Sequence, residues 1–434
     1  MARAVSGGGR PAAAGLEAGY GERIITPPIG TELAGYGFYL ERRAERVLDE
    51  LHVRSLCVRL GDARVFLISC DLIGLAVDEA DRHRRRIADR WGLPPAHVLL
   101  ACTHTHSGPA TKPAIGLGEM DAAYMDRLPG WIDEAVDRSA ADLRRCTMRV
   151  GEGVVDGIGR NRRGPEAGAA DPGLRVARFE RPDRRIYLVG YACHPVTAGP
   201  TGDVTADWPG AVAACFEEAG DRGLVLQGCS GEIDPVAACR GNGVGASEAV
   251  RRTGERLALH ARRIAARADP CAPAGVAAAE RRIALPLVAW SGERIAQEAR
   301  AFVERFGLFP GAPRFASEWE RLARASGGRL AERPFVDGVP IQAVGIGPLR
   351  ILALPGEPFT RIGARIREGA PGAWVAGYAN GSVGYLPSRE AFADPADYAC
   401  WCAPRFTTLV PFAPGLEDRG VREGLAALSA VPVR

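Results

Sequence analysis

The sequence predicts an α/β fold in which a single large domain contains a mixed β-sheet flanked by helices. The first reason is an order of strand, polar loop and helix that recurs along the chain. The second reason is composition, because the 434 residues are 47% hydrophobic and 25% charged, as in globular proteins with a large core. The third is that the loops after several strands carry the residues able to do chemistry.

The first half of the chain contains the clearest strand and helix signals. Residues 1–20 have no apolar stretch typical of a secretory signal and predict a flexible leader, so the domain is expected to occupy residues 21–434. The apolar and alternating patterns predict a hairpin, a helix and a buried strand, in the order Leu51–Leu60 with Val65–Cys70, Asp78–Trp91 and Val98–Cys102.

The second half repeats the pattern around a possible insertion. Two strands, a helix with an Asp-Trp-Pro start and a third short strand are expected at Leu174–Phe179, Ile186–Ala192, Asp207 to about Gly220, and Leu224–Leu226. About residues 269–333, with charged helices near Glu293–Phe306 and Glu318–Arg329, form a possible insertion or lobe. A hairpin and a last strand follow at Ile341–Ile346 with Leu349–Leu354, and at Ala373–Tyr378.

The segment T-H-T-H-S-G-P at 103–109 follows the buried strand Val98–Cys102 and stands out chemically. His104 and His106 are two residues apart, so on an extended chain their side chains point to the same side. Imidazole is both a common metal ligand and an acid or base near neutral pH. The pair therefore represents two ligands, one ligand and one catalytic base, or two histidines that only hydrogen-bond within a loop.

Two further loops after strands add matching groups. His194 follows Ile186–Ala192, and Glu357 follows Leu349–Leu354. With His104 they supply two nitrogens and one oxygen, a donor set that suits a catalytic zinc ion with an open position for water. No local H-E-x-x-H signature is present, so the ligands would come from distant parts of the sequence.

These segments, in this order, resemble the catalytic domain of the neutral/alkaline non-lysosomal ceramidase family. The matching pieces are I-T-P-P-I-G within 24–30, T-H-T-H-S-G-P at 103–109, N-R at 161–162, H-P at 194–195, G-x-x-G-x-x-x-P at 228–235, P-G-E at 355–357, and Asn380–Tyr385 followed by Tyr398. The resemblance implies an α/β catalytic domain with one zinc ion that hydrolyses an amide bond in a lipid-like N-acyl substrate.

Carried over residue by residue, the resemblance also implies roles for individual side chains. The zinc ligands would be His104, His194, Glu357 and Tyr385. Three other residues would surround the scissile amide, namely His106, Arg162 and Tyr398. A guanidinium or phenol at that place stabilises an oxyanion, and His106 can pass a proton to the leaving amine.

Two departures from the family pattern affect the expected substrate. Asp234, in the loop Gly231–Pro235, occupies the position of a serine in family members with ceramidase activity, so hydroxyl chemistry is not expected there. Asp234 is instead a candidate base or binder of a substrate amine. Little sequence follows Phe406, so no C-terminal immunoglobulin-like domain is expected. Together with the lack of a signal sequence, this favours a smaller, soluble amide substrate.

Charge and cysteine content bear on the binding partners and the cell compartment of the protein. A net charge of +3 gives no strong attraction to nucleic acid, and no apolar run is long enough to span a membrane. Eleven cysteines without a regular framework favour free thiols in a reducing compartment, so a cytoplasmic location is expected. Lys112 is the only lysine, which excludes Schiff-base chemistry at any other lysine. The sequence leaves the oligomeric state open.

The sequence thus predicts a zinc-dependent amidohydrolase for a lipid-derived or small amide substrate. Two alternatives are also compatible with the sequence. The same metal site would act on an ester or lactone, or in a cyclisation, because the loop of Asp234 is altered. The second alternative is a catalytically silent binding protein on the same fold. The presence of all four proposed ligands argues against it, namely His104, His194, Glu357 and Tyr385.

Overall fold

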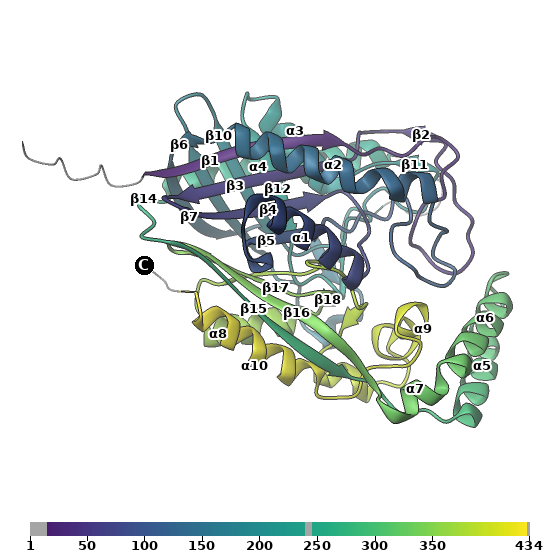
Figure 1. Ribbon diagram of the computed structural model, residues 1–434. Coiled ribbons are helices and arrows are strands. Elements are labelled where there is room, and N and C mark those ends of the chain that lie inside the picture. The colour runs from purple at the N-terminus through teal and green to yellow at the C-terminus, as the bar shows by residue number, and fades with distance from the viewer. Residues whose placement is uncertain (1–14, 239–244, 432–434) are drawn as a thin grey trace, which may run out of the picture.

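The computed structural model describes residues 15–238 and 245–431 and contains three large mixed sheets (Figure 1). The first sheet has the order β5 (Val98–Cys102), β4 (Ala63–Cys70), β3 (His52–Leu60), β1 (Leu16–Ile24) and β6 (Arg144–Arg145). The second has the order β12 (Arg222–Gln227), β10 (Arg185–Tyr191), β9 (Gly173–Glu180), β7 (Thr147–Val154) and β14 (Pro270–Cys271). The third has the order β15 (Val276–Pro286), β16 (Phe335–Ile346), β17 (Leu349–Ala353) and β19 (Trp374–Ala376).

Each large sheet combines antiparallel hairpins with one parallel pair at an edge. The parallel pairs are β4 with β5, β10 with β12, and β17 with β19. Three two-stranded ladders complete the strands: β2 (Arg46–Val47) with β11 (Asp203–Val204), β8 (Gly159–Asn161) with β13 (Ile233–Pro235), and β18 (Glu357–Pro358) with β20 (Tyr385–Leu386).

The three sheets share one central core, and each has its own pair of covering helices. The alternation of β3 shows the principle, because Leu56 and Val58 join the core shared by the sheets while Val53 and Cys57 join the core beneath the helices. The helix pairs are α1 (Val77–Trp91) with α2 (Ala122–Ala141), α3 (Asp207–Glu217) with α4 (Ala246–Arg267), and α8 (Thr360–Gly369) with α10 (Leu416–Ser429).

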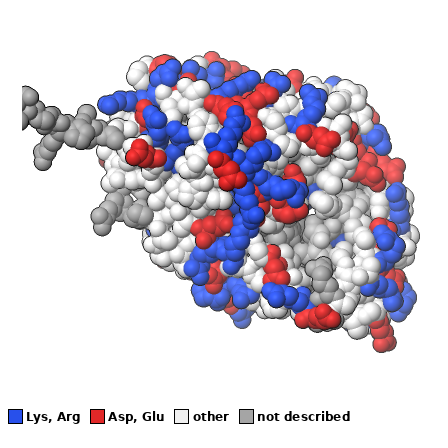
Figure 2. Space-filling model, in the orientation of Figure 1, with Lys and Arg blue, Asp and Glu red and all other residues white. Residues whose placement is uncertain are grey.

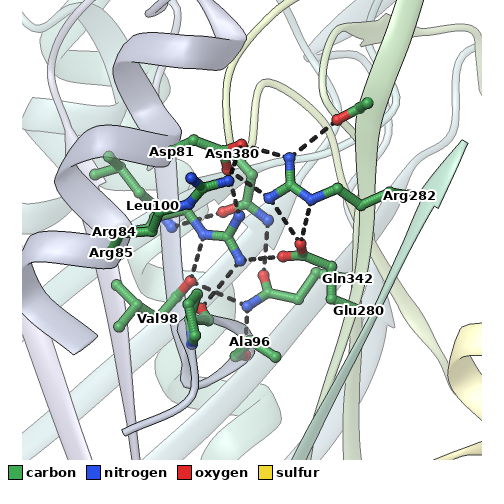
Figure 3. Close-up of polar contacts among 12 residues, drawn as sticks. Asp81, Arg84, Arg85, Ala96, Val98, Leu100, Glu280, Arg282, Gln342 and Asn380 are labelled. Atoms are coloured by element: carbon green, nitrogen blue, oxygen red, sulfur yellow. Dashed lines mark hydrogen bonds and ion pairs between the residues drawn. The ribbon is translucent and has the colours of Figure 1, made fainter. Parts of the chain in front are cut away.

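A buried polar network fastens α1 to β15 of the third sheet (Figure 3). The Arg84 side chain is fully buried and donates to the Val98 carbonyl at 2.9 Å and to Asp81 at 3.1 Å. It also pairs with Glu280, while Arg282 donates to Asp81 at 2.8 Å. Because every charge in the network has a partner, its burial is tolerated and it fixes the first sheet against the third.

The helices of the expected lobe form a separate hairpin beside the main body (Figure 1). They are α5 (Gly292–Phe306), α6 (Ala312–Ala325) and the short α7 (Gly327–Glu332). Their apolar faces pack on residues near α9 (Pro404–Thr407) and on Phe38. The lobe lies between β15 and β16 in the chain, and it packs on the body through aromatic contacts together with the ion pair of Glu298 and Arg405 at 2.6 Å.

The predicted α/β class is confirmed, while the arrangement of its strands differs in one respect. The expected single mixed sheet is divided into three, because the strand pattern of a segment does not tell which sheet it joins. Strand β1 begins at Leu16, inside the segment expected to be a leader, since Leu16, Ala18 and Tyr20 alternate into the core. Residues 1–14 lie outside the described residues.

The surface charge and the character of the helices both agree with the composition. On the face shown in Figure 2, arginines and acidic side chains are interleaved, in keeping with the small net charge. Within residues 15–238 and 245–431, none of the helices combines the length and apolar character needed to cross a bilayer.

Candidate active site

The parallel strand pairs deliver the candidate site residues from all three sheets. His104 and His106 follow β5, His194 follows β10, and Glu357 follows β17. Because the carboxyl ends of these strands meet at one end of the central core, residues far apart in sequence come together. All eight side chains predicted from the sequence line one cavity of about 710 Å³, namely His104, His106, Arg162, His194, Asp234, Glu357, Tyr385 and Tyr398.

His104 is held in one orientation by the loop after β4. Its Nδ1 lies 2.5 Å from the Ile73 carbonyl oxygen, and its backbone N–H donates to the Leu72 carbonyl at 2.9 Å. The residue adopts a positive φ of 72°, an uncommon backbone conformation for a side chain with a Cβ. A carbonyl acceptor at Nδ1 places the proton there, so Nε2 faces the cavity with its lone pair.

His194 is held in the same way by a different loop. Its Nδ1 lies 2.7 Å from the Ser230 carbonyl oxygen and 3.2 Å from that of Ile233. The side chain is fully buried, and among the described residues its Nε2 has no hydrogen-bond partner. Two histidines with Nδ1 bound to backbone carbonyls and Nε2 turned to a common point form the arrangement typical of metal-ligating imidazoles.

Glu357 closes this donor set. Its Oε2 atom lies 3.4 Å from Nε2 of His104 and 3.4 Å from Nε2 of His194. Within the described chain, Oε2 is buried and forms no hydrogen bond. Burial alone would raise the pKa of Glu357, but the neighbouring imidazoles and Lys112 hold it well below its usual range. The carboxylate is thus kept charged in the interior.

Close backbone packing places Glu357 next to both His194 and Tyr385. Glu357 pairs with Tyr385 in the parallel ladder of β18 and β20. A Cβ on Gly231 would lie 2.5 Å from the Glu357 carbonyl oxygen, so only glycine lets the loop between β12 and β13, whose Ser230 carbonyl holds the His194 ring, approach Glu357 this closely. The glycines of this region are therefore part of how the site is assembled.

Asn380 positions the segment that carries Tyr385 (Figure 3). Its side-chain oxygen accepts from the Leu100 N–H at 3.1 Å, and its backbone N–H donates to the Leu100 carbonyl at 2.6 Å. Its amide nitrogen donates to Gln342 at 2.8 Å. Asn380 thus ties this segment to β5 and β16 together, which explains why the Asn380–Tyr385 motif belongs to the site without any catalytic role for Asn380.

Arg162 is fixed on the cavity wall by three different acceptors. It donates to the Tyr385 hydroxyl at 2.8 Å, to the Gly231 carbonyl at 2.7 Å and to the Asp234 carboxylate at 3.2 Å. Its guanidinium also lies 5.9 Å from the centre of the Tyr398 ring. Burial lowers the pKa of Arg162, but Tyr385 and Asp234 together raise it, so the group stays cationic.

His106 lies at the edge of the donor set. Its Nε2 is 3.2 Å from Nε2 of His104, while its buried Nδ1 has no hydrogen-bond partner in the described part of the chain. Gly35 packs against this ring, and a Cβ there would come 2.5 Å from Nδ1. The Nε2 or Nδ1 atoms of His104, His106 and His194 lie within 4.8 Å of one another, so these three can also hold a metal ion.

One wall of the cavity is aromatic and comes from three distant parts of the chain. Phe38 stacks on Phe406 with 6.0 Å between ring centres, and it packs edge to face on Phe306 and Phe309 of the lobe at 5.9 and 6.0 Å. All four rings line the cavity, as does Leu117. The site therefore combines a polar floor with a wall suited to an apolar group.

Asp71 and the buried cysteines do not take part in the site. Asp71 pairs with Arg54 at 2.6 Å and accepts from Thr103, so its carboxylate is not the partner of a site histidine. The carbonyl of Ile73 is the partner of His104 instead. Burial raises the pKa of the Cys102 thiol to about 12, which leaves this cysteine protonated and inert.

Lys112 is a charged cavity residue that the sequence did not place in the site. It lines the cavity, and its Nζ donates to the Ser382 hydroxyl at 3.2 Å. Its position six residues after His106 and its being the only lysine of the chain were the available signals.

The fold and the site together define an α/β protein with a buried histidine–carboxylate centre beside an apolar wall. Comparison with known proteins confirms the resemblance to neutral ceramidases. A neutral ceramidase of Mycobacterium tuberculosis is 25% identical over 448 aligned positions, which cover 83% of this chain and 69% of the relative. No family model matches the chain.

Solved structures show the same fold. The crystal structure of neutral ceramidase from Pseudomonas aeruginosa superposes with a TM-score of 0.74 at 18% identity, covering 97% of this chain and 76% of that one. A ceramidase complexed with C2 gives a TM-score of 0.73 at 18% identity, with the same coverage of both chains. The chain therefore has the fold of the neutral ceramidase catalytic domain.

Proposed function

We propose that this protein is a zinc-dependent hydrolase that cleaves the amide bond of an N-acyl, lipid-derived or small substrate. The observation that supports it most directly is the pair of buried atoms, His194 Nε2 and Glu357 Oε2, that have no hydrogen-bond partner among the described residues and lie 3.4 Å apart. Leaving such atoms unpaired in the interior is costly unless a ligand satisfies them.

The donor set fits a zinc ion. His104, His194, Glu357 and Tyr385 are the proposed ligands, and the carbonyl partners of the two Nδ1 atoms fix the tautomer that ligation needs. His106 is an alternative to Tyr385 in this set. A zinc ion held there would supply an activated water and polarise the scissile carbonyl.

Arg162 is placed to stabilise negative charge that develops on the carbonyl oxygen. Its three acceptors hold the guanidinium rigidly, and preorganised donors are effective because they need no reorganisation during the reaction. The Tyr385 oxygen accepts from Arg162, and the Tyr385 hydroxyl also interacts with the Glu357 carboxylate. Tyr398, whose ring centre lies 5.8 Å from that of Tyr385, covers the same side of the cavity.

His106 is the proposed acid and base. Burial, with the charge of neighbouring His104 and His194, lowers the pKa of His106 well below its usual value, so the free ring is a neutral base near pH 7. After taking a proton it can pass that proton to the amine as the C–N bond breaks. Asp234 is bound to Arg162, so we assign it to holding that guanidinium.

The substrate class follows from the wall opposite the polar floor. The rings of Phe38, Phe306, Phe309 and Phe406 offer an apolar surface for an acyl chain. The Mycobacterium tuberculosis relative and the Pseudomonas aeruginosa structure are both named neutral ceramidases, which supports an amide as the bond that is cleaved.

A single experiment tests this proposal. The purified protein is assayed for bound zinc, and then for hydrolysis of an N-octanoyl amide and the matching octanoyl ester, with His104→Ala as the inactive variant. About one zinc ion per chain and faster hydrolysis of the amide are expected. Faster hydrolysis of the ester would favour the alternative of an esterase or lactonase, and zinc without any turnover would indicate a binding protein.

A further inference from the structure

Lys112 is a buried amine in the cavity with incomplete hydrogen bonding. It lies in the loop that follows His106 and is only 7% exposed. An ammonium group has three donors, and the Ser382 hydroxyl at 3.2 Å is the single hydrogen-bond acceptor found for Nζ among the described residues. At least one donor of this side chain therefore remains for a ligand in the cavity.

The charge of Lys112 also has no direct partner among the residues that the structure describes. Within the described chain no carboxylate oxygen forms an ion pair with Nζ, and the carboxylate whose charge acts on it is that of Glu357. Glu357 is already shared between the two imidazoles, 3.4 Å from each Nε2. The other cation of the cavity, Arg162, is neutralised by Asp234. Lys112 is thus the cavity cation without a bonded counter-ion.

A second unpaired group lies on the same side of the cavity. The Thr407 hydroxyl is buried without a hydrogen-bond partner in residues 15–238 and 245–431, and it lines the cavity. It lies next to Gly384, where a Cβ would come 2.9 Å from its oxygen. The Gly384 N–H in turn donates to the Ser382 oxygen at 3.3 Å, the same oxygen that binds Lys112. Lys112 and Thr407 therefore flank one polar corner.

We propose that this corner binds a carboxylate of the substrate, so that the substrate is an N-acyl amino acid or a similar amide with a carboxylate on the amine side. The inference rests on the proposed amidohydrolase function. One ammonium and one hydroxyl match a single negative charge, whereas a phosphate monoester carries close to two. The carboxylate carbon of an N-acylglycine is two bonds from the amide nitrogen, so a carboxylate at this corner keeps the amide near Glu357, whose backbone N–H donates to the Gly384 carbonyl at 2.9 Å.

The two halves of the cavity then have separate roles. The acyl chain lies against the aromatic wall, and the carboxylate lies at Lys112 and Thr407. A buried lysine is costly to keep in an apolar interior, and a carboxylate beside it offsets that cost when the substrate binds. An uncharged amide such as a ceramide would leave the amine unpaired, which disfavours its binding.

The test uses two probes that differ only in this charge, N-octanoylglycine and N-octanoylglycinamide. Their dissociation constants are measured by isothermal titration calorimetry on the zinc-loaded protein, for the wild type, Lys112→Met and Lys112→Arg. Arg252→Met is the matched control, since it removes an equal charge whose side chain is 74% exposed on α4. Hydrolysis of both probes is followed in parallel.

The wild type and Arg252→Met are expected to bind the acid about tenfold more tightly than the amide. Lys112→Met is expected to lose this preference, and Lys112→Arg to keep part of it. Equal binding of the two probes by the wild type, a preference that survives in Lys112→Met, or no binding of either probe overturns the proposal. Should Lys112→Met not fold, Lys112→Gln gives the same comparison.

The outcomes separate this inference from the function on which it rests. Hydrolysis of both probes without preference for the acid overturns the role of Lys112 and leaves the amidohydrolase intact. A Lys112-dependent preference in binding without hydrolysis of either probe supports the carboxylate site and overturns the amidohydrolase.

Discussion

The Nε2 atom of His194 lies 3.4 Å from Oε2 of Glu357, and neither atom has a hydrogen-bond partner among the described residues. His194 follows β10 of the second sheet and Glu357 follows β17 of the third, so the pair bridges two sheets. Within the described part of the chain, two atoms with lone pairs for a metal ion are thus buried without a partner, which is the arrangement expected where a cation binds.

Removing His194 should therefore abolish metal binding while leaving the fold intact. We expect His194→Ala to lower zinc affinity by more than the roughly 10–100-fold typical of losing an outer partner of a ligand. Metal content after dialysis, determined by mass spectrometry, checks this. The matched control His260→Ala, on α4, should keep its zinc. Equal zinc content in all three proteins would contradict the site.

The identity of the remaining ligand distinguishes Tyr385 from His106. If Tyr385 is the ligand, Tyr385→Phe lowers zinc affinity, whereas His106→Ala retains zinc and loses about 10²–10⁴-fold in kcat as a proton-transfer variant. Zinc titration and steady-state kinetics on both variants give the answer. Zinc lost from His106→Ala and retained by Tyr385→Phe would instead assign the metal to the three histidines that lie within 4.8 Å of one another.

Arg162 should act on the transition state more than on binding. We expect Arg162→Met to lower kcat by about 10²–10³-fold with little change in KM, the loss typical of a removed oxyanion donor. Arg162→Lys should not restore the rate, because one ammonium cannot keep the Tyr385, Gly231 and Asp234 contacts at once. A variant that raises KM and leaves kcat unchanged would show that Arg162 only binds substrate.

A histidine outside the site should make the fold sensitive to acid. His83 is 1% exposed, and burial lowers its pKa to about 4 despite Glu79 at 3.0 Å. Since the unfolded chain keeps a pKa near 6.5, it binds more protons than the folded protein between pH 6.5 and 4, and stability falls as the pH drops through this range.

From these values, about 2 kcal/mol of the free energy of unfolding is lost between pH 7 and pH 5 through this one group. Urea denaturation of the metal-free protein at pH 7 and pH 5 measures it, and His83→Gln should show a smaller loss. Between pH 7 and pH 8 the two proteins should behave alike. An identical loss in both proteins at pH 5 would place the acid sensitivity elsewhere.

The sequence predicts the α/β class and the strand ends because both depend on local patterns. His104, His194 and Glu357 each follow an apolar strand, so their delivery to one end of the core could be expected. The contacts that orient these side chains could not be predicted. The partner of His104 is the backbone carbonyl of Ile73, and every residue has such a carbonyl, so the sequence carries no signal for it. Asp71, which has a suitable side chain, is instead taken by Arg54.

The aromatic wall of the cavity is a second feature that could not be predicted from the sequence. Phe38 and Phe309 are far apart in the sequence, and each lies in a segment with no periodic pattern of its own. Their meeting depends on how the lobe packs against the body, at ring distances near 6 Å. Such long-range contacts carry no local signal, so the size and lining of the cavity emerge only from the folded chain.

The burial of Lys112 leads to a prediction about stability that is independent of any substrate. Among the described residues this buried ammonium has one hydrogen bond and no ion pair, which opposes folding, so an apolar side chain of similar length should be better tolerated there. We expect Lys112→Met to raise the free energy of unfolding of the metal-free protein by about 1–2 kcal/mol. Urea denaturation measures this, with Arg252→Met as the exposed control.

A gain in stability from Lys112→Met would mean that the native lysine lowers the free energy of unfolding, as residues of binding sites often do. Lys112→Met would then be more stable and at the same time unable to distinguish N-octanoylglycine from its amide. A loss of stability would have the opposite meaning, because it would show that the contact of Lys112 with Ser382 holds the cavity wall together and that the amine serves the structure.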